Sequence, residues 1–349
     1  MQHHHDILIV GAGPAGSSAA VAAAKNNAKV LLIDKKKIIG EPVQCAEYVP
    51  RLLISKIDVS SSCISQKVDG MKTYMSNSEC FETRSPGYIL HRDIFDKELV
   101  KKAVDFGADL CLNAECISKN NDKVLIKEKG KKKVITSKIV IGADGPCSTV
   151  GSWIKCENTN FLVGLQYKVP LVSPLNFTKV YFDKRFFGGY GWVFPKDKYA
   201  NVGIGVKQGK PGLNLNNLLD SFTRFLEEKN IIKNTPVLKN GGLIPCGGFL
   251  NSVKDNIVLV GDAAGHTHPI TGGGISQAVL CGRIAGKTAS KAVNEDDFSI
   301  LNEYKSEWQS IFADELNRAK IKRELFEASW NDLDNVIRKC WTTFREYYE

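Results

Sequence analysis

The chain has 349 residues, of which 43% are hydrophobic and 24% charged, with a formal net charge of +9. These proportions are ordinary for a soluble globular protein, and the length suggests two domains. No apolar run approaches the roughly 20 residues of a membrane-spanning helix, and we expect no signal peptide. The lysine clusters within residues 35–37 and 129–133 lack interleaved aromatic residues. We therefore expect solvated surface and no nucleic-acid partner, with an anionic lipid headgroup as the alternative.

The ten cysteines contain no Cys-x-x-Cys pair. A zinc or iron–sulfur site is therefore not predicted, and a chain of this length needs no disulfide scaffold. We expect most cysteines, such as Cys111 and Cys116, to be small core residues in a reducing cytoplasm.

The N-terminal segment predicts a dinucleotide-binding unit. An apolar strand (Asp6–Val10) leads into a glycine turn, an alanine-rich helix through Lys25 and a second strand that ends at Asp34. The glycines allow a tight turn, approach of a pyrophosphate and close packing of helix on strand, while Asp34 suits a ribose hydroxyl pair. The predicted contacts to the dinucleotide are Gly11, Gly13, Pro14, Ala15, Gly16, Asp34 and Lys35.

The next part of the chain mixes short strands with one helix. The helix begins at His91-Arg92 and stops at Gly107, and a buried strand (Ile139–Ile141) ends in Ala143-Asp144-Gly145. The other predicted strands are Val68–Met75, Cys80–Thr83, Tyr88–Leu90, Ala108–Ile117, Val124–Lys127 and Lys133–Thr136.

From about Asn158 the pattern favours an antiparallel sheet. Residues 161–169 alternate with a period of two. Gly203 and Gly205 alternate with branched residues, so one face of that strand carries no side chains and indicates close approach of a ligand or another surface. The further elements are strands at Val180–Phe182, Tyr190–Phe194, Val202–Val206 and Gly241–Phe249 and a helix at Leu215–Glu228.

A second ligand-binding edge follows. Four branched apolar residues, Ile257–Val260, end in Gly261-Asp262, and Gly272-Gly273-Gly274 opens a small-residue helix whose N–H groups face a ligand unobstructed. Beyond it, 298–318 and 321–344 are expected to be helical. Their apolar spacing favours packing against the domain, with membrane-surface contact or an oligomer interface as the alternatives.

Three of these motifs, Gly11–Gly16, Asp144-Gly145 and Gly261-Asp262, resemble the flavin signatures of the para-hydroxybenzoate hydroxylase superfamily. Within it, Tyr190-Gly191-Trp192-Val193-Phe194-Pro195 resembles the Tyr-x-Trp-x-Phe-Pro element of the geranylgeranyl reductase family, and Pro269–Ile275 resembles its flavin-facing loop. Arg92 matches an arginine near the FAD phosphates. Cys45 falls where many members have a cysteine, followed here by Ala46-Glu47 instead of two glycines.

The resemblance implies a Rossmann-like α/β FAD-binding domain of glutathione reductase/para-hydroxybenzoate hydroxylase type, with an inserted antiparallel-sheet (α+β) substrate domain and a C-terminal helical segment. The expected FAD-binding domain comprises residues 1–65, 91–157 and 251–295, the substrate domain 66–90 and 158–250, and the C-terminal helices 296–349. Asp262 would hold the middle of FAD, and Gly272–Gly274 the N1/O2 edge of the flavin. The further FAD contacts implied are Cys45, Arg92, Ala143, Asp144, Gly145, Gly261, Pro269 and Ile275.

The implied activity is an FAD-dependent reduction of C=C bonds in an isoprenoid, lipid-like substrate by hydride from flavin N5. Tyr190, Trp192, Phe194, Gly203 and Gly205 would line the apolar pocket, although core aromatics are the alternative interpretation. Candidate proton donors are Cys45 and Tyr190, with His266 and His268 weaker.

NAD(P)H or reduced ferredoxin is the expected electron donor, since no second dinucleotide fingerprint is present. The competing hypotheses are an aromatic monooxygenase or halogenase, and an electron-transfer flavoprotein acting on a quinone or protein partner. We expect a cytoplasmic protein with peripheral membrane contact.

Overall fold

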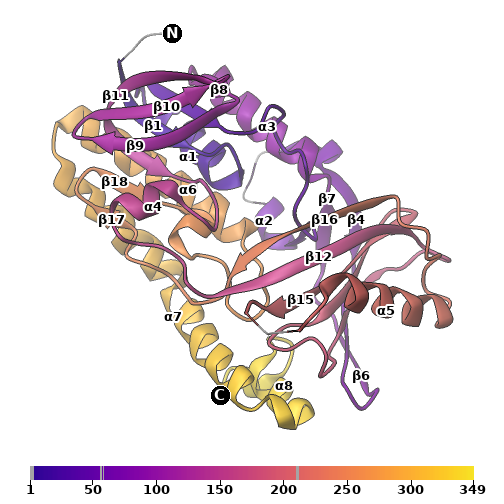
Figure 1. The fold of residues 1–349 in the computed structure, drawn as a ribbon. Helices are drawn as coiled ribbons and strands as arrows, with labels where there is room; N and C mark the ends of the chain where they lie inside the picture. Colours follow the sequence, from indigo (N-terminus) through magenta and orange to yellow (C-terminus); the bar gives the residue numbers. More distant parts are fainter. Residues whose placement is uncertain (1–3, 56, 58, 210–211) are drawn as a thin grey trace.

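Two large sheets lie side by side in the protein, with helices covering their faces (Figure 1). The structure, a computed structural model, describes residues 4–55, 57, 59–209 and 212–349. Parts of the predicted FAD-binding and substrate segments, residues 1–3, 56, 58 and 210–211, lie outside the described residues.

The first sheet is mostly parallel. Its strand order is β17 (Val253–Lys254), β18 (Ile257–Leu259), β11 (Lys131–Gly142), β1 (His4–Val10), β2 (Val30–Asp34) and β8 (Asp109–Leu112). An antiparallel extension is formed by β10 (Lys123–Glu128), which pairs with β11 and with β9 (Ala114–Asn120). The parallel strands are apolar at consecutive positions because both of their faces are covered. Ile7 and Ile9 of β1 thus lie in one buried cluster, whereas Leu8 and Val10 lie in another.

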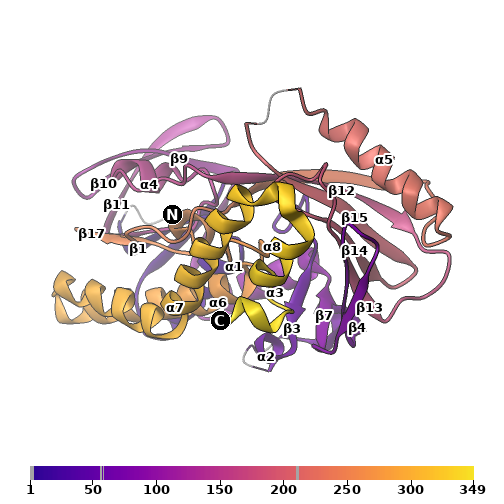
Figure 2. The same cartoon turned by 90° about the horizontal axis from the view of Figure 1, so that it is seen from below.

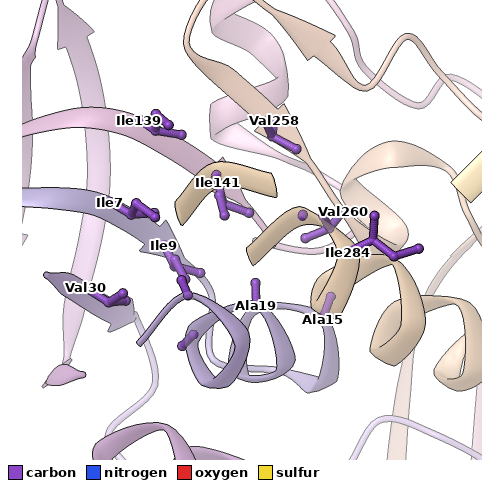
Figure 3. Packing of buried hydrophobic residues seen from close by; sticks show 14 of the residues in the cluster. Ile7, Ile9, Ala15, Ala19, Val30, Ile139, Ile141, Val258, Val260 and Ile284 are labelled. Atoms are coloured by element: carbon purple, nitrogen blue, oxygen red, sulfur yellow. The ribbon is translucent and has the colours of Figure 1, made fainter. Parts of the chain in front are cut away.

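Close helix packing holds the glycine turn beneath this sheet. Helix α1 (Pro14–Lys25) packs closely against α6 (Ile275–Glu295), and Figure 3 shows Ala15 and Ala19 of α1 below the strands, beside the helix that carries Ile284. A Cβ on Gly282 would lie 2.2 Å from the Ala15 carbonyl oxygen, so only glycine allows the two helices to approach this far. Helix α3 (Arg92–Asp105) packs against the other side of α1.

The second sheet has seven strands and is antiparallel except at β13–β5. Its order is β16 (Leu238–Pro245), β12 (Phe161–Pro170), β15 (Tyr199–Lys207), β14 (Gly191–Lys196), β13 (Phe177–Tyr181), β5 (Gly70–Tyr74) and β6 (Cys80–Thr83). Helix α5 (Leu215–Glu228) covers one face, where its Phe222 packs with Val202 and Ile204. Trp192 and Phe194 point to the opposite face.

A small third sheet connects the two. It consists of β3 (Tyr48–Pro50), β7 (Gly87–Leu90) and β4 (Ile64–Val68). The strand predicted over Val68–Met75 is present as β5, but Val68 itself ends β4, which belongs to a different sheet. At Gly70, the first residue of β5, a Cβ would lie 2.1 Å from the Thr83 carbonyl oxygen. Short helices α2 (Arg51–Ile54) and α4 (Thr149–Trp153) complete this part.

The C-terminal helices cover the aromatic face of the second sheet. Figure 2 shows α7 (Leu301–Ala328) and α8 (Leu333–Cys340) across the junction of the two sheets. Phe326, Trp330, Ile337 and Trp341 pack into one buried cluster with Trp192, which confirms packing against the domain. The predicted break between residues 318 and 321 is wrong, because α7 continues through it and ends only before Ser329.

Two strand boundaries also differ from prediction. The expected strands at Lys133–Thr136 and Ile139–Ile141 form one continuous strand, β11, because its first half pairs with β10 and its second with β18. The return strand ends at Pro245 and not at Phe249. Cys111 and Cys116 are buried core residues, as predicted.

Candidate active site

The glycine turn after β1 is shaped for close approach of a ligand. Gly11 has a φ of +104°, and a Cβ there would lie 2.3 Å from the Ala143 carbonyl oxygen. A Cβ on Gly16 would lie 1.8 Å from the Gly11 carbonyl oxygen, whereas one on Gly13 would meet nothing within 4 Å. Gly11 and Gly16 are thus required by the fold, but the space before Gly13 is open. Helix α1 begins there with no side-chain cap and no acidic residue in its first turn, an arrangement that favours a phosphate.

Asp34 lies at the end of β2 beside this turn. One of its carboxylate oxygens accepts from the Ala12 N–H at 2.7 Å and the other from the Lys36 N–H at 2.7 Å. These bonds fix the carboxylate while leaving each oxygen a further acceptor position. The geometry suits the predicted contact with a ribose hydroxyl pair.

Cys45, Arg92 and Asp262, which are far apart in the sequence, converge in the tertiary structure. Burial raises the pKa of the Cys45 thiol, and the nearby Arg92 guanidinium lowers it by less. Burial likewise raises the pKa of Asp262, while the Thr267 hydroxyl and then Arg92 lower it. Both groups therefore lie within electrostatic reach of one arginine.

Arg92 itself is held by Asp96. Its Nε and one terminal nitrogen each donate to an Asp96 carboxylate oxygen at 3.0 Å. Burial alone would lower the pKa of Arg92, but Asp96, Cys45 and Glu47 together raise it. A guanidinium that is positively charged and mostly buried fits the predicted place near FAD phosphates.

The Gly261-Asp262 turn faces the start of α6. Thr267 Oγ1 donates to Asp262 Oδ1 at 2.6 Å, and a Cβ on Gly274 would lie 3.4 Å from the same oxygen. Helix α6 has no side-chain cap and no acidic residue in its first turn. Its N-terminal N–H groups can therefore stabilise negative charge next to the Asp262 carboxylate.

Asp144 has a visible structural role. Its carboxylate accepts from the Ser148 hydroxyl at 2.6 Å and from the Thr149 and Val150 N–H groups, which are the first of α4. Burial raises its pKa, although these hydrogen bonds oppose the shift. Asp144 thus caps a helix behind Ala143, the residue against which Gly11 packs.

The aromatic element lies directly against the predicted flavin-facing loop. Tyr190 Oη donates to the Thr271 carbonyl oxygen at 2.5 Å. Trp192 and Phe194 are 7% exposed and lie in the same cluster as Ile270 of that loop. The close approach predicted at Gly203 comes from another side chain of the protein, because a Cβ there would lie 2.3 Å from Cζ2 of the Trp192 indole. Gly205 is less crowded, with Trp192 Cζ3 at 3.6 Å.

The two histidines of this segment are not free proton donors. His266 is 1% exposed, and burial lowers its pKa to about 3, so it is neutral at physiological pH. His268 Nδ1 accepts from the Ile270 and Thr271 N–H groups, and its Nε2 lies 3.1 Å from Glu315 Oε1. The hydrogen bond from His268 is the main cause that lowers the pKa of Glu315. Both ring nitrogens of His268 therefore order the loop.

Several side chains that hold the site were not predicted. Glu47, 2% exposed with a φ of +72°, pairs with Lys196 Nζ at 2.6 Å and accepts from the Arg92 N–H at 3.1 Å. Its own N–H donates to Cys45 Sγ at 3.2 Å. Arg323 of α7, 3% exposed, donates to the Pro269 carbonyl oxygen at 2.6 and 2.9 Å and also to the Gly188 carbonyl oxygen. No local pattern marks these residues, because their partners are distant in the sequence.

A surface hollow of about 800 Å³ lies elsewhere, lined by Lys291, Glu303 and Glu307. It lies at the far end of α6 and includes none of the predicted site residues. Among the described residues, no group of three or more His, Cys, Asp or Glu side chains is placed to hold a metal ion.

The geometry fits FAD. The open approach to Gly13 and the Arg92 guanidinium suit a pyrophosphate, and the Asp34 carboxylate suits a ribose. The start of α6 suits an electron-rich ring edge. Residues 6–43 match the family of FAD-dependent oxidoreductases, and residues 163–244 match the geranylgeranyl reductase catalytic domain. The fold and site thus define an FAD-dependent oxidoreductase.

Similar proteins show to which family of FAD-dependent oxidoreductases the chain belongs. The chain is 34% identical to the digeranylgeranylglycerophospholipid reductase of Methanococcus aeolicus, over 87% of this chain and 83% of that protein. It is 37% identical to digeranylgeranylglycerophospholipid reductase 1 of Methanopyrus kandleri, over 87% and 85%. The chain belongs to the geranylgeranyl reductase family.

Solved structures confirm the predicted fold. A geranylgeranyl bacteriochlorophyll reductase-like protein of Thermoplasma acidophilum superposes with a TM-score of 0.86 at 28% identity, covering 99% of this chain and 93% of that one. PqsL, a probable FAD-dependent monooxygenase of Pseudomonas aeruginosa, superposes with a TM-score of 0.72 at 16% identity, covering 96% and 99%. The second likeness shows the shared fold alone.

Proposed function

We propose that the protein saturates C=C bonds in the isoprenoid chains of a glycerophospholipid. The observation that carries the proposal is the contact between Tyr190 Oη and the Thr271 carbonyl oxygen, which joins the aromatic element to the flavin-facing loop. Relatives named digeranylgeranylglycerophospholipid reductase, 34% and 37% identical to this chain, support the choice of substrate.

FAD, when bound, supplies the hydride for such a reduction at its N5 atom. The residues of the chain bind the cofactor and orient the substrate. The turn at Gly13 and the Asp34 carboxylate hold the adenosine half, and Arg92 offsets phosphate charge. The N–H groups at the start of α6 stabilise negative charge at the ring edge. Trp192 and Phe194 offer an apolar wall that excludes water and aligns a prenyl chain.

The hydride adds to one carbon of the double bond, and we assign to Cys45 the proton that the other carbon receives. Burial raises the pKa of this thiol above its ordinary value of 9.0, so the thiol carries its proton at neutral pH. Burial also raises the pKa of Tyr190, but its hydroxyl hydrogen is engaged by Thr271. Cys45 is therefore the better placed donor, and Tyr190 is its alternative.

The electron donor is proposed to be NAD(P)H or reduced ferredoxin. The chain has one dinucleotide fingerprint, which the predicted adenosine site uses. A donor must then reach the flavin transiently, either as a nicotinamide or through docking of a small iron–sulfur protein. Reduction of the bound flavin by each donor under anaerobic conditions distinguishes them.

A peripheral contact with the lipid surface is part of the proposal. No helix among the described residues has the length and apolarity needed to traverse a bilayer. The outer side of α7 exposes Ile311, Ile321 and Leu325, which are 54%, 64% and 38% exposed. Apolar side chains that protrude from a helix are suited to the headgroup boundary of a membrane, where a lipid substrate is held.

The decisive experiment is an anaerobic turnover. Reduced holoenzyme is mixed with a geranylgeranyl-bearing glycerophospholipid, and flavin absorbance and lipid mass are followed. We expect reoxidation of the flavin and an increase of two mass units for each saturated bond. Unchanged lipid with oxygen-dependent NAD(P)H consumption on an aromatic compound would instead identify a monooxygenase or halogenase. Reoxidation only by a quinone or protein partner would identify an electron-transfer flavoprotein.

A further inference from the structure

Gln166 is a buried polar residue in the middle of β12, and no motif includes it. It is 4% exposed, and its strand neighbours Leu165 and Tyr167 pack on the opposite face, toward α5. A glutamine at a buried position of an alternating strand requires partners for both its donor and its acceptor.

The amide has a partner on each side of the site. Gln166 Nε2 donates to the Cys45 carbonyl oxygen at 2.8 Å, across 121 residues of sequence. Gln166 Oε1 accepts from Trp192 Nε1 at 3.1 Å. One side chain thus connects the loop that carries the thiol to the indole of the apolar wall.

Gly203 makes this connection sterically feasible. It stands opposite Gln166 in the pairing of β12 with β15 and opposite Trp192 in the pairing of β14 with β15. A Cβ at this position would lie 2.6 Å from Gln166 Cβ and 2.3 Å from Trp192 Cζ2. The missing side chain lets the indole lie across the strand and reach the amide.

The same loop is held further along by the same sheet. Asn201 Nδ2 donates to the Ala46 carbonyl oxygen at 3.3 Å and to Glu47 Oε2 at 2.8 Å, and Lys196 pairs with Glu47. These contacts secure Glu47. Among the hydrogen bonds of the described residues, only those of Gln166 join the Cys45 backbone to an aromatic side chain of the wall.

We propose that Gln166 is a positioning residue that couples Trp192 to Cys45. Through its amide, the wall that aligns a prenyl chain and the thiol assigned as proton donor keep one relative geometry. The inference deepens the proposed function and relies on it only for the kinetic part of its test. A change in the position of the indole is then transmitted to the Cys45 backbone without contact between the two residues.

Three variants separate the two bonds. Gln166→Glu keeps the acceptor for Trp192 but loses the donor to Cys45, and Gln166→Met loses both. Trp192→Phe keeps the donor to Cys45 but removes the indole N–H together with part of the ring. The matched control is Gln66→Met. Gln66 also bridges, donating to the Leu175 carbonyl oxygen at 2.6 Å and accepting from the Asp197 N–H at 2.9 Å.

The first readout is the rate of Cys45 alkylation by iodoacetamide in the FAD-loaded protein, resolved by peptide mass spectrometry. We expect about a fivefold increase in both Gln166 variants, the change that loss of one hydrogen bond gives. Trp192→Phe should change the rate in the same direction by less, and Gln66→Met should leave it unchanged.

The second readout is the steady-state kinetics with a geranylgeranyl lipid. Gln166→Met and Trp192→Phe should both raise KM, even though Gln166 lies behind the wall and does not touch the substrate. Gln166→Glu should mainly lower kcat. Unchanged alkylation in both Gln166 variants, or equal effects of Gln66→Met, would overturn the proposal. If Gln166→Met does not fold, the other two variants decide. If the wild-type protein reduces no alkene, the proposed function fails while the alkylation rates still test the coupling.

Discussion

At the scale of single residues, the glycines of the first turn have different functions. Gly16 is required by the fold, since a Cβ would lie 1.8 Å from the Gly11 carbonyl oxygen. Gly13 has ordinary extended dihedral angles (φ −75°, ψ −176°) and free space where its side chain would be. The polypeptide itself therefore does not require a residue without a side chain at this position, whereas a ligand that approaches it does.

A pair of alanine substitutions tests this difference. Gly13→Ala should change the free energy of unfolding of the apoprotein by less than about 1 kcal/mol, the usual cost at a helix N-cap. It should nevertheless weaken FAD binding at least about tenfold, because the methyl group occupies the approach of the pyrophosphate. Gly16→Ala should destabilise the apoprotein by about 1–3 kcal/mol through overpacking. Urea unfolding and FAD titration measure the two effects, and equal destabilisation of the apoprotein would contradict the assignment.

His266 makes the stability of the protein depend on pH. It lies against the Trp308 ring with a centroid distance of 4.5 Å, and neither of its nitrogens has a hydrogen-bond partner among the described residues. Burial lowers its pKa to about 3 from an ordinary value of 6.5, so the folded state favours the neutral ring. The resulting stabilisation is fully present above pH 6.5 and is lost as the pH falls toward 3.

The expected loss attributable to His266 is about 2 kcal/mol between pH 7 and pH 5. His266→Phe keeps a ring against Trp308 but cannot be protonated, so its unfolding free energy should fall less over this interval. Denaturant unfolding at several pH values gives the difference between the two proteins. Parallel pH profiles would show that the buried ring is not the cause.

At the scale of elements, helix α7 is a brace for the flavin-facing loop. Its Arg323 guanidinium contacts the carbonyl oxygens of Pro269 and Gly188, one on each side of the Tyr190–Thr271 contact. Burial lowers the pKa of Arg323, yet an arginine stays charged in proteins. About two turns nearer the start of α7, Glu315 contacts His268, the residue that precedes Pro269, and Tyr347 contacts the same ring.

Arg323→Met should therefore loosen the loop. Hydrogen bonds from a charged donor contribute about 1.5–3 kcal/mol, and the variant leaves two buried carbonyl oxygens without that donor. We expect a destabilisation of about 2–4 kcal/mol, weaker FAD binding and a lower kcat. Arg323→Lys, which keeps the charge but not the fork, should be intermediate.

Arg345→Met is the control for this substitution, since its side chain is 91% exposed. It should change stability by less than about 0.5 kcal/mol. The effects of Arg323→Met are measured by urea unfolding, flavin fluorescence and steady-state kinetics. If none of the three changes, α7 does not brace the loop.

At the scale of the whole molecule, the C-terminal segment completes the apolar wall. The Trp341 ring packs edge-on against Tyr190 and Phe182, with centroid distances of 5.0 and 5.1 Å. Residues from the middle and the C-terminal part of the chain thus meet over one sheet face. The three aromatic residues predicted to line the pocket are covered by helices that follow them by more than 100 residues.

Trp341→Ala should cost about 3–5 kcal/mol, the usual loss for removing a buried aromatic ring. It should also raise the KM for a prenyl lipid, because Tyr190 loses its packing partner. Tyr348→Ala, at a residue that is 58% exposed, is the control and should cost about 1 kcal/mol or less. Equal losses in the two variants would mean that the C-terminal cover adds nothing specific to the wall.

Much of the site was predictable because its signals are local. The turn at Gly11–Gly16, Asp34 and the Gly272–Gly274 start of α6 each lie within one strand–turn–helix unit, so the prediction of a ligand site at each rests on local sequence. Element boundaries were less predictable where pairing decides them, as in the single strand β11. The uninterrupted α7 follows from the absence of glycine and proline after residue 286, which gives no stop signal.

The sequence by itself determined the glycine turns, the buried parallel strands, the aromatic element and, through their resemblance, the flavin chemistry. Only the tertiary structure decided which polar side chains hold these parts together. Lys196 reaches Glu47 across 149 residues and Arg323 reaches Pro269 across 54. Such contacts leave no periodicity or spacing in the chain, because buried polar groups need partners in space and not neighbours in sequence.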